Sequence, residues 1–242
     1  MIAYAEKSPP ISSFIEDEGT IKLSDNIQLL SSFSKQQKEW RNEFEYLINE
    51  NIDSICVVGN SASLLDKSIG KLIDKHALVI RFNNYCSDVS LQEHCGKNID
   101  VWVKSPDFNE PDKQLGIDVG WTVISGPDVN YTMSDWSNVK LTLAKGGKVV
   151  MPPLQVWRDL VKILKAPPSA GLLVIMWIIQ ITGKADGLSV AGFQTLSENE
   201  QEQYHHSSSA HKAGERHNWK EEKKLLKAWQ NEGLNFLDSE GL

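Results

Sequence analysis

The chain has 242 residues, of which 40% are hydrophobic and 24% charged, proportions usual for a globular protein of one domain. Its net charge of −7, with acidic and basic residues interspersed, argues against a nucleic-acid-binding protein, which normally carries a basic surface. Three cysteines without a C-x-x-C pair favour a reducing compartment.

The longest apolar run, Ala170 to Ile181, is too short to cross a bilayer, and the first residues lack the pattern of a signal peptide. We therefore expect a cytoplasmic protein without a transmembrane segment, with peripheral contact at the inner face of the membrane left open. Residues 1–32 carry two adjacent prolines, several serines and an acidic cluster, which predict a loosely packed lead-in. Residues 33–242 are expected to form the main domain, which opens with a helix from Ser34 to Glu50.

Strands and helices alternate in the rest of the chain. Apolar strands at Ser54–Val58 and Ala77–Phe82 flank an amphipathic helix at Ser63–Lys75, an order typical of a parallel sheet covered by helices. Further strands are expected at Asp100–Lys104, Trp121–Ser125, Lys148–Val150 and Gly187–Phe193, and helices at Leu154–Leu164, Ala170–Thr182 and Trp219–Asn231. A polar stretch from Glu200 to Arg216 predicts a loop. The sequence thus indicates one α/β domain with a mainly parallel sheet.

A first candidate site follows the first strand, at Gly59, Asn60 and Ser61, with Asn83 at the end of the next strand. Ligands of parallel sheets bind at the carboxyl ends of the strands. Gly59 permits a close approach to the backbone, and the two asparagine amides can both donate and accept hydrogen bonds, which suits a ribose or a phosphate. An ordinary turn remains an alternative. Neither G-x-G-x-x-G nor a Walker lysine is present, so the sequence does not support a dinucleotide or P-loop site.

A second candidate site is the start of the apolar helix, at Ser169, Ala170 and Gly171, directly after two prolines. Ser169 is a favourable N-cap, and Gly171 exposes backbone N–H groups. The partial positive charge and the unpaired N–H groups of a helix N-terminus suit a phosphate. A capped core helix that binds no ligand is the alternative.

The third candidate site lies among histidines near the C-terminus. The histidines of this region are His205, His206, His211 and His217. Their spacing matches no common zinc site, so we expect no metal. His217 stands just before the last helix, where the Glu222 carboxylate can orient or charge-tune the imidazole, and such a ring can take a proton from a sugar hydroxyl. Ordinary surface residues at a helix start are the alternative.

In chain order, these segments resemble the sialyltransferase motifs of glycosyltransferase family 29. The large motif is similar to Cys56–Ser61, running on to Val79–Asn83, and the small motif to Pro168–Leu173, ending at Val190–Phe193. The very small motif, a histidine followed by a glutamate after four residues, matches His217 and Glu222. The resemblance implies a modified Rossmann fold of the GT-A-like type, a CMP-activated acidic sugar as donor, a glycan or lipid-linked glycan as acceptor, and inversion at the anomeric carbon.

The resemblance also implies residue roles. Gly59, Asn60, Ser61 and Asn83 would hold the CMP, and Ser169, Ala170 and Gly171 would contact the phosphate or carboxylate of the donor. His217 would be the catalytic base, with Glu222 beside it. The family needs no metal or cofactor, and the sequence contains no D-x-D.

The chain departs from the family pattern in several ways. The helix from Ala170 to Thr182 lacks the cysteine that joins two motifs in the animal enzymes, and Ala170 stands where threonine is usual. A fourth motif has only a degraded counterpart at Tyr204–His206, which makes His205 and His206 candidates for protonating the leaving phosphate. These departures suggest a bacterial-type relative. A CMP-Kdo transferase of surface polysaccharide and a non-catalytic nucleotide- or glycan-binding module remain alternatives, whereas an NAD-dependent oxidoreductase lacks its glycine fingerprint.

Overall fold

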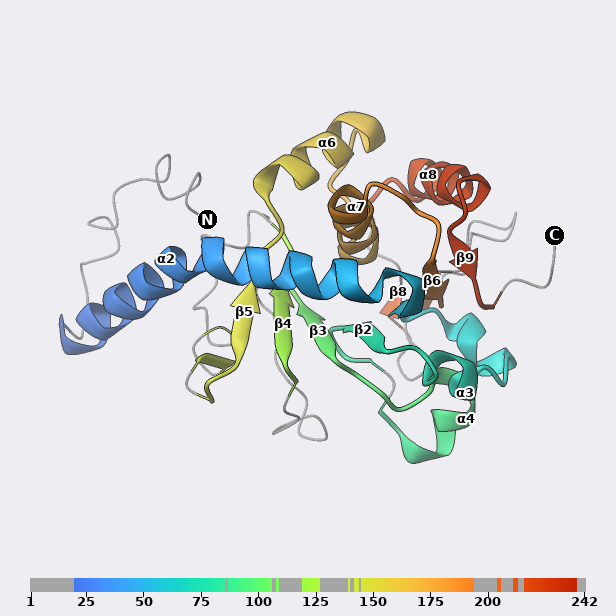
Figure 1. Cartoon of the computed structure of the whole chain (residues 1–242), viewed down its shortest axis with the longest axis horizontal. Helices are drawn as coiled ribbons and strands as arrows, with labels where there is room; N and C mark the ends of the chain where they lie inside the picture. The colour runs from blue at the N-terminus through green and yellow to red at the C-terminus, as the bar shows by residue number, and fades with distance from the viewer. Residues whose placement is uncertain are drawn as a thin grey trace.

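The computed structural model of the chain is an α/β structure with helices on both faces of a sheet (Figure 1). It describes residues 20–85, 87–105, 108, 119–126, 139, 142–143, 145–193, 204–205, 211–212 and 216–238. For 20–34, 204–205 and 211–212 the description is of the backbone alone. Within these residues, no helix is both long and apolar enough to span a membrane.

Among the described residues, the sheet has seven strands in the order β5–β4–β3–β2–β1–β6–β9, and every neighbouring pair is parallel. The strands are β1 (Ile55–Val58), β2 (Leu78–Phe82), β3 (Val101–Lys104), β4 (Trp121–Ile124), β5 (Lys148–Val150), β6 (Leu188–Ala191) and β9 (Asn235–Phe236). β1, β2, β3 and β6 are buried along their whole length, which explains their continuous apolar runs.

The strand order changes direction at β1. The chain moves outward from β1 to β5 and then returns to the other side of β1 as β6. This change places the carboxyl ends of β1 and β6 next to each other. Open parallel sheets bind ligands outside the carboxyl ends of the strands at such a point.

Four long helices cover one face of the sheet. They are α2 (Thr20–Asn51), α6 (Leu154–Leu164), α7 (Ala170–Thr182) and α8 (Trp219–Asn231), and their apolar residues form one core with those of the strands. Figure 1 shows α2 running across the strands, with α6, α7 and α8 above it. Shorter elements cover part of the other face: η3 (Ala62–Asp66), α3 (Gly70–Ile73), η4 (Val89–Leu91) and α4 (Gln92–Cys95).

The helix α7 is apolar on nearly all sides because it is packed between the sheet and other helices. Its Trp177 is 1% exposed and stacks on Phe44 of α2, with ring centroids 4.8 Å apart. Phe44 in turn meets Trp121 of β4 edge-on at 5.4 Å. Offset and edge-on aromatic pairs add to the stabilisation from burial. The packing of its body in the core therefore fixes the position of the first residues of α7.

On the opposite face of the sheet, a buried arginine holds the short helix α4 against β2. Arg81 of β2 is 1% exposed, and its guanidinium donates to the carbonyls of Asn98 at 2.7 Å and Cys95 at 2.6 Å. Burial lowers the pKa of Arg81 from its ordinary value. Because both acceptors lie at or just beyond the end of α4, the side chain ties this short helix to the sheet.

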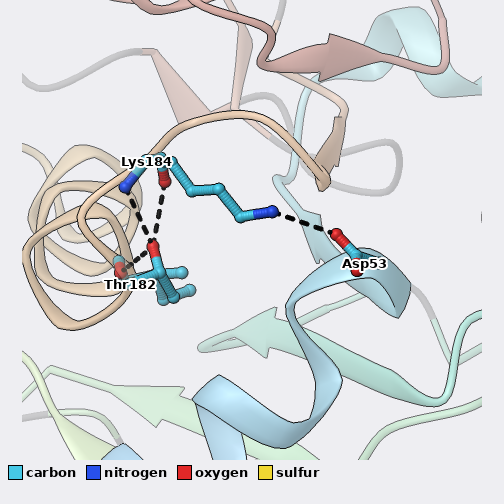
Figure 2. Close-up of polar contacts among 4 residues, drawn as sticks. Asp53, Thr182 and Lys184 are labelled. Atoms are coloured by element: carbon cyan, nitrogen blue, oxygen red, sulfur yellow. Dashed lines mark hydrogen bonds and ion pairs between the residues drawn. The ribbon is translucent and has the colours of Figure 1, made fainter.

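The amino ends of β1 and β6 are joined by a surface contact (Figure 2). Lys184, four residues before β6, places its Nζ 3.3 Å from Oδ1 of Asp53, two residues before β1. The Thr182 hydroxyl donates to the Lys184 carbonyl at 2.9 Å and so closes the end of α7. The ion pair is largely exposed, and such pairs contribute about 1 kcal/mol at most.

The structure confirms most of the predicted elements and corrects others. α6, α8 and β5 have the predicted bounds, and the other predicted strands differ by one or two residues at an end. The helix expected from Ser34 begins at Thr20, since neither glycine nor proline interrupts residues 20–51.

The helix expected at Ser63–Lys75 is wrong: η3 and α3 are separate short pieces. Gly70, the first residue of α3, packs against α4, where a Cβ would be 2.0 Å from the Gln92 oxygen. The segment 200–216 was expected to be a loop, yet it contains the paired strands β7 (Tyr204–His205) and β8 (His211–Lys212). β9 was not predicted, because two residues show no periodicity.

One side chain of α2 covers the edge of the sheet. Gln37 is 1% exposed; its Nε2 donates to the Val149 carbonyl at 2.7 Å, and its Oε1 accepts from the Met151 N–H at 3.0 Å. The amide thus pairs with residues 149 and 151 as a further strand would. This contact protects an edge that otherwise presents unpaired backbone groups.

We predict that Gln37→Ala lowers the free energy of unfolding by about 1–3 kcal/mol, because it leaves a buried N–H and a buried C=O without partners. Gln36→Ala is the matched control, since Gln36 is exposed on the same helix. Urea denaturation of both variants measures the difference. Equal stability of the two variants would contradict the assigned role of Gln37.

Candidate active site

Two glycine turns meet where β1 and β6 end side by side. The Gly59 N–H donates to the Ala191 carbonyl at 2.7 Å, and the Ser61 N–H donates to the Gly192 carbonyl at 3.3 Å. A Cβ on Gly59 would lie 2.4 Å from the Gly192 oxygen, and Gly192 has φ +69°, in the left-handed region that favours glycine. Both positions require glycine, because the two turns pack directly against each other.

The two predicted asparagines follow the carboxyl ends of β1 and β2, and we call this pair the asparagine rim. One side chain donates a hydrogen bond and the other accepts one. Asn60 Nδ2 donates to the Phe82 carbonyl at 2.9 Å, whereas Asn83 Oδ1 accepts from the Ser105 N–H at 2.8 Å. Within the described residues, Asn60 therefore retains its amide oxygen as an acceptor and Asn83 retains its amide nitrogen as a donor. Asn83 has φ 42°, a left-handed conformation that asparagine tolerates better than most residues.

Ser61 contributes through its backbone and through a cap. Its hydroxyl accepts from the Ser63 N–H at 3.3 Å and from the Ser63 hydroxyl at 2.9 Å, at the start of η3. The side chain therefore shapes the turn after Asn60. Its N–H holds the Gly192 carbonyl, as described above.

A buried carboxylate clamps the start of α7. The Ser169 N–H donates to Glu222 Oε1 and the Ser169 hydroxyl donates to Glu222 Oε2, both at 2.7 Å. The same hydroxyl accepts from the Leu172 N–H at 3.2 Å as the N-cap of the helix. Glu222 is 4% exposed, and burial raises its pKa, while the two bonds from Ser169 act in the opposite direction. The first turns of α7 and α8 are thereby locked together.

An aromatic ring joins the start of α7 to the rim. A Cβ on Gly171 would lie 2.4 Å from Cε1 of Phe193, so glycine lets the ring rest on the helix. Phe193 directly follows Gly192, and its ring meets Phe82 edge-on at 6.2 Å. Phe82 is also the residue whose carbonyl holds Asn60. One ring therefore contacts the second candidate segment and the end of β2.

The third candidate segment contacts the chain just before the start of α7. His217 Nδ1 lies 2.9 Å from the Pro167 carbonyl, two residues before Ser169. Because a carbonyl can only accept, Nδ1 carries the proton and Nε2 is the basic nitrogen of the neutral ring. Arg216 Nε lies 3.5 Å from Nε2, and the Trp219 ring meets the imidazole edge-on at 5.1 Å.

These bonds change the role expected of Glu222. We expected its carboxylate to orient or charge-tune His217. Both of its oxygens instead bind Ser169, and the Pro167 carbonyl orients the imidazole. Glu222 consequently acts on the geometry of the α7 start, and it is a positioning residue.

The remaining predicted residues divide into two groups. Ala170 is the first residue of α7 and lies at the clamped helix start. His205 belongs to β7, where its backbone pairs with His211, while its side chain and all of His206 lie outside the described residues. Among the residues that the structure describes, no group of three histidine, cysteine or acidic side chains is placed to hold a metal ion.

Sequence reasoning missed two residues of this site. Phe193 was noted only as the end of a motif, although an aromatic residue directly after a strand-ending glycine was a usable signal. Asp238 accepts from the Gly192 N–H at 2.8 Å through Oδ2. No local pattern around Asp238 could have indicated this bond, because it spans 46 positions of the chain.

The raised pKa of Glu222 predicts how pH changes stability. Its ordinary value is 4.5, and the folded protein holds the proton more tightly than the unfolded chain. The stabilisation from this carboxyl is therefore fully present below pH 4.5 and is lost as pH rises through the folded pKa. We predict that the unfolding free energy of the unsubstituted chain, relative to Glu222→Gln, falls with rising pH. Urea titrations between about pH 4 and pH 8 measure it, and a rising difference would contradict the raised pKa.

Comparisons with known proteins show similarity in sequence and in fold. A family model described as glycosyltransferase family 29 (sialyltransferase) matches residues 4–110, a segment that includes Asn60 and Asn83. No curated protein matches the sequence. The fold is similar to that of a mammalian sialyltransferase in complex with Gal-β-1-3GalNAc-ortho-nitrophenol, at a TM-score of 0.55 and 15% identity over 76% of this chain and 69% of that chain.

A second structure of a mammalian sialyltransferase gives a TM-score of 0.56 at 15% identity, over 76% of this chain and 68% of that chain. At such low identity, the structural likeness establishes a shared fold. The family match covers residues 4–110, fewer than half of the residues of the chain, so the comparisons show a chain that is similar to glycosyltransferase family 29 (sialyltransferase) and shares the fold of these two sialyltransferases.

Proposed function

We propose that the chain moves an acidic keto-sugar of the sialic acid type from a CMP-sugar to a glycan hydroxyl, by metal-independent inversion on a GT-A-like modified Rossmann fold. The observation that carries this proposal is the convergence of three distant segments. Asn60 and Asn83 follow β1 and β2, the Phe193 ring after β6 contacts Gly171 at the start of α7, and His217 lies against the Pro167 carbonyl just before that helix.

The hydrogen-bonding groups of the rim suit a nucleotide. Asn60 retains an acceptor for a ribose hydroxyl or the cytosine amine, and Asn83 retains a donor for a phosphate oxygen. The two glycine turns pack against each other and so fix the backbone from which Asn60 projects.

The start of α7 suits the phosphate. Its Ser169 N–H is taken by Glu222, and its Leu172 N–H by the Ser169 hydroxyl. Within the described residues, the N–H groups of Ala170 and Gly171 are the donors that remain at this helix end. These N–H groups carry the partial positive charge of the helix N-terminus, which favours the binding of an anion. A backbone contact of this kind is unaffected by alanine in place of the threonine usual in the family.

The chemical step follows from the orientation of His217. Nε2 takes the proton of the acceptor hydroxyl as that oxygen bonds to the anomeric carbon of the sugar. The bond from the anomeric carbon to the phosphate oxygen breaks at the same time, and CMP leaves with the electron pair. The N–H groups of Ala170 and Gly171 stabilise the charge that develops on the phosphate. His205 and His206 remain the candidates for protonating that phosphate.

We predict that His217→Ala lowers kcat on the order of 100-fold or more, since it removes the general base. The unsubstituted enzyme should lose activity on the acidic side of neutrality as the imidazole is protonated, and the variant should lack that limb. Release of CMP from CMP-sialic acid in the presence of a glycan acceptor measures both effects, and CMP-Kdo in a parallel assay tests the alternative donor.

His76→Ala is the matched control for this experiment. The ring of His76 also meets backbone carbonyls, those of Leu72 at 3.0 Å and Ile73 at 3.1 Å, but it lies at the end of α3 just before β2. This variant should keep near-normal turnover. Near-normal turnover in His217→Ala would remove His217 from the mechanism.

A further inference from the structure

The last described residues of the chain return to the candidate active site. β9 pairs with β6, and the Asn235 amide donates to the Ser189 hydroxyl at 3.1 Å. Beyond the strand, the Leu237 N–H donates to the Val190 carbonyl at 2.9 Å. Asp238 then accepts from the Gly192 N–H at 2.8 Å. The C-terminal segment thus follows β6 to its carboxyl end and binds the turn there.

Gly192 needs an external constraint at this point. Glycine has the widest conformational freedom of any residue, and Gly192 adopts φ +69° in a buried turn. Its carbonyl is held by the Ser61 N–H and its N–H by Asp238, so both backbone polar groups are bound by other parts of the chain. Loss of the carboxylate would leave a buried N–H unpaired and free the turn to rotate.

The shape of this turn determines two neighbouring contacts. A Cβ on Gly192 would lie 2.8 Å from the Gly59 oxygen, so the turn supports the start of the asparagine rim directly. Phe193, the next residue, rests on Gly171 at the start of α7. A rotation at Gly192 would therefore separate the rim from the helix end that together form the proposed nucleotide site.

The Asp238 carboxyl also acts on groups other than Gly192. Burial raises the pKa of this carboxyl, while the Gly192 N–H and the nearby Lys67 act in the opposite direction. Burial also raises the pKa of the Cys56 thiol on β1 to about 12, and Asp238 adds to that rise. The carboxyl group is thus close enough to act on β1 as well as on the turn after β6.

We propose that Asp238 is a positioning residue for donor binding, which holds Gly192 and so keeps the turn after β6 in the shape that accepts CMP. The inference rests on the proposed function of this site. Asp238 acts through Gly192 and has no part in the chemical step. Its loss should weaken the binding of the donor more than it slows turnover at saturation.

The chain offers a matched control for a purely structural effect. Asp74 also binds backbone N–H groups, those of Lys97 at 2.9 Å and Asn98 at 2.9 Å, but it does so before the amino ends of β2 and β3, at the opposite ends of the strands. Asp74→Ala should therefore destabilise the fold without changing the affinity for CMP. A general loss of stability and a local change of the site are separated in this way.

The test is titration calorimetry of the full chain with CMP. We expect Asp238→Ala to raise the Kd about tenfold, the size of effect typical for one lost hydrogen bond. Asp238→Asn should stay within about threefold, because its amide oxygen still accepts from Gly192. Asp238→Glu keeps the charge but moves the oxygens, and it should raise the Kd as alanine does; if the alanine variant fails to fold, the asparagine and glutamate variants decide. In turnover assays the donor KM of Asp238→Glu should rise more than its kcat falls.

The outcomes separate the two proposals. No binding of CMP by the unsubstituted chain would overturn the proposed function. Binding by that chain with an unchanged Kd in Asp238→Ala or Asp238→Glu would overturn only the role of Asp238. An Asp238→Asn variant as weak as these two, or equal weakening in Asp74→Ala, would also overturn it, because the hydrogen bond to Gly192 would not be the cause.

Discussion

The close approach of two backbone turns, at Gly59 and Gly192, is the constraint on which the rest of the site depends. β1 and β6 are neighbours in the sheet, but their paired residues, from Ile55 with Leu188 to Val58 with Ala191, lie 133 positions apart in sequence. The turns that follow these strands can touch only because residues 59 and 192 are both glycine. The contact brings a rim from the first third of the chain to a segment near its end.

The helix α7 extends this arrangement away from the sheet. Its apolar body is held in the core by Trp177 and Phe44, so its start keeps a fixed place. Glu222 of α8 then binds that start. The carbonyl of Pro167, just before α7, orients the His217 ring. The packed core thus fixes both the helix end that is proposed to bind an anion and the imidazole of His217. Preorganised groups of this kind need little rearrangement when charge develops during a reaction.

Short-range signals in the sequence were sufficient for the elements that present the site. Apolar runs identified the buried strands, and the residues after them identified Asn60 and Asn83. The proline pair and Ser169 marked the start of α7, and the last helix was located from its periodicity. In each case the decisive physics is local: strand burial, helix capping or backbone conformation.

Contacts between distant parts of the chain could not be predicted in the same way. Three such contacts join residues 46 or more positions apart: Glu222 with Ser169, Gln37 with Met151, and Asp238 with Gly192. Local signals also failed where packing overrides propensity, as at Gly70, which divides an apparently continuous helix by its contact with α4. Local signals therefore indicate the candidate groups, whereas the contacts of Gln37, Asp238 and Glu222 depend on the tertiary structure.

A crystal structure of the chain with CMP tests the central claim most directly. The account predicts the phosphate within hydrogen-bond distance of the Ala170 and Gly171 N–H groups and of Asn83 Nδ2, with the nucleoside over the glycine turns and His217 Nε2 facing the same space. CMP bound elsewhere, or a His217 ring directed away from the phosphate, would contradict it.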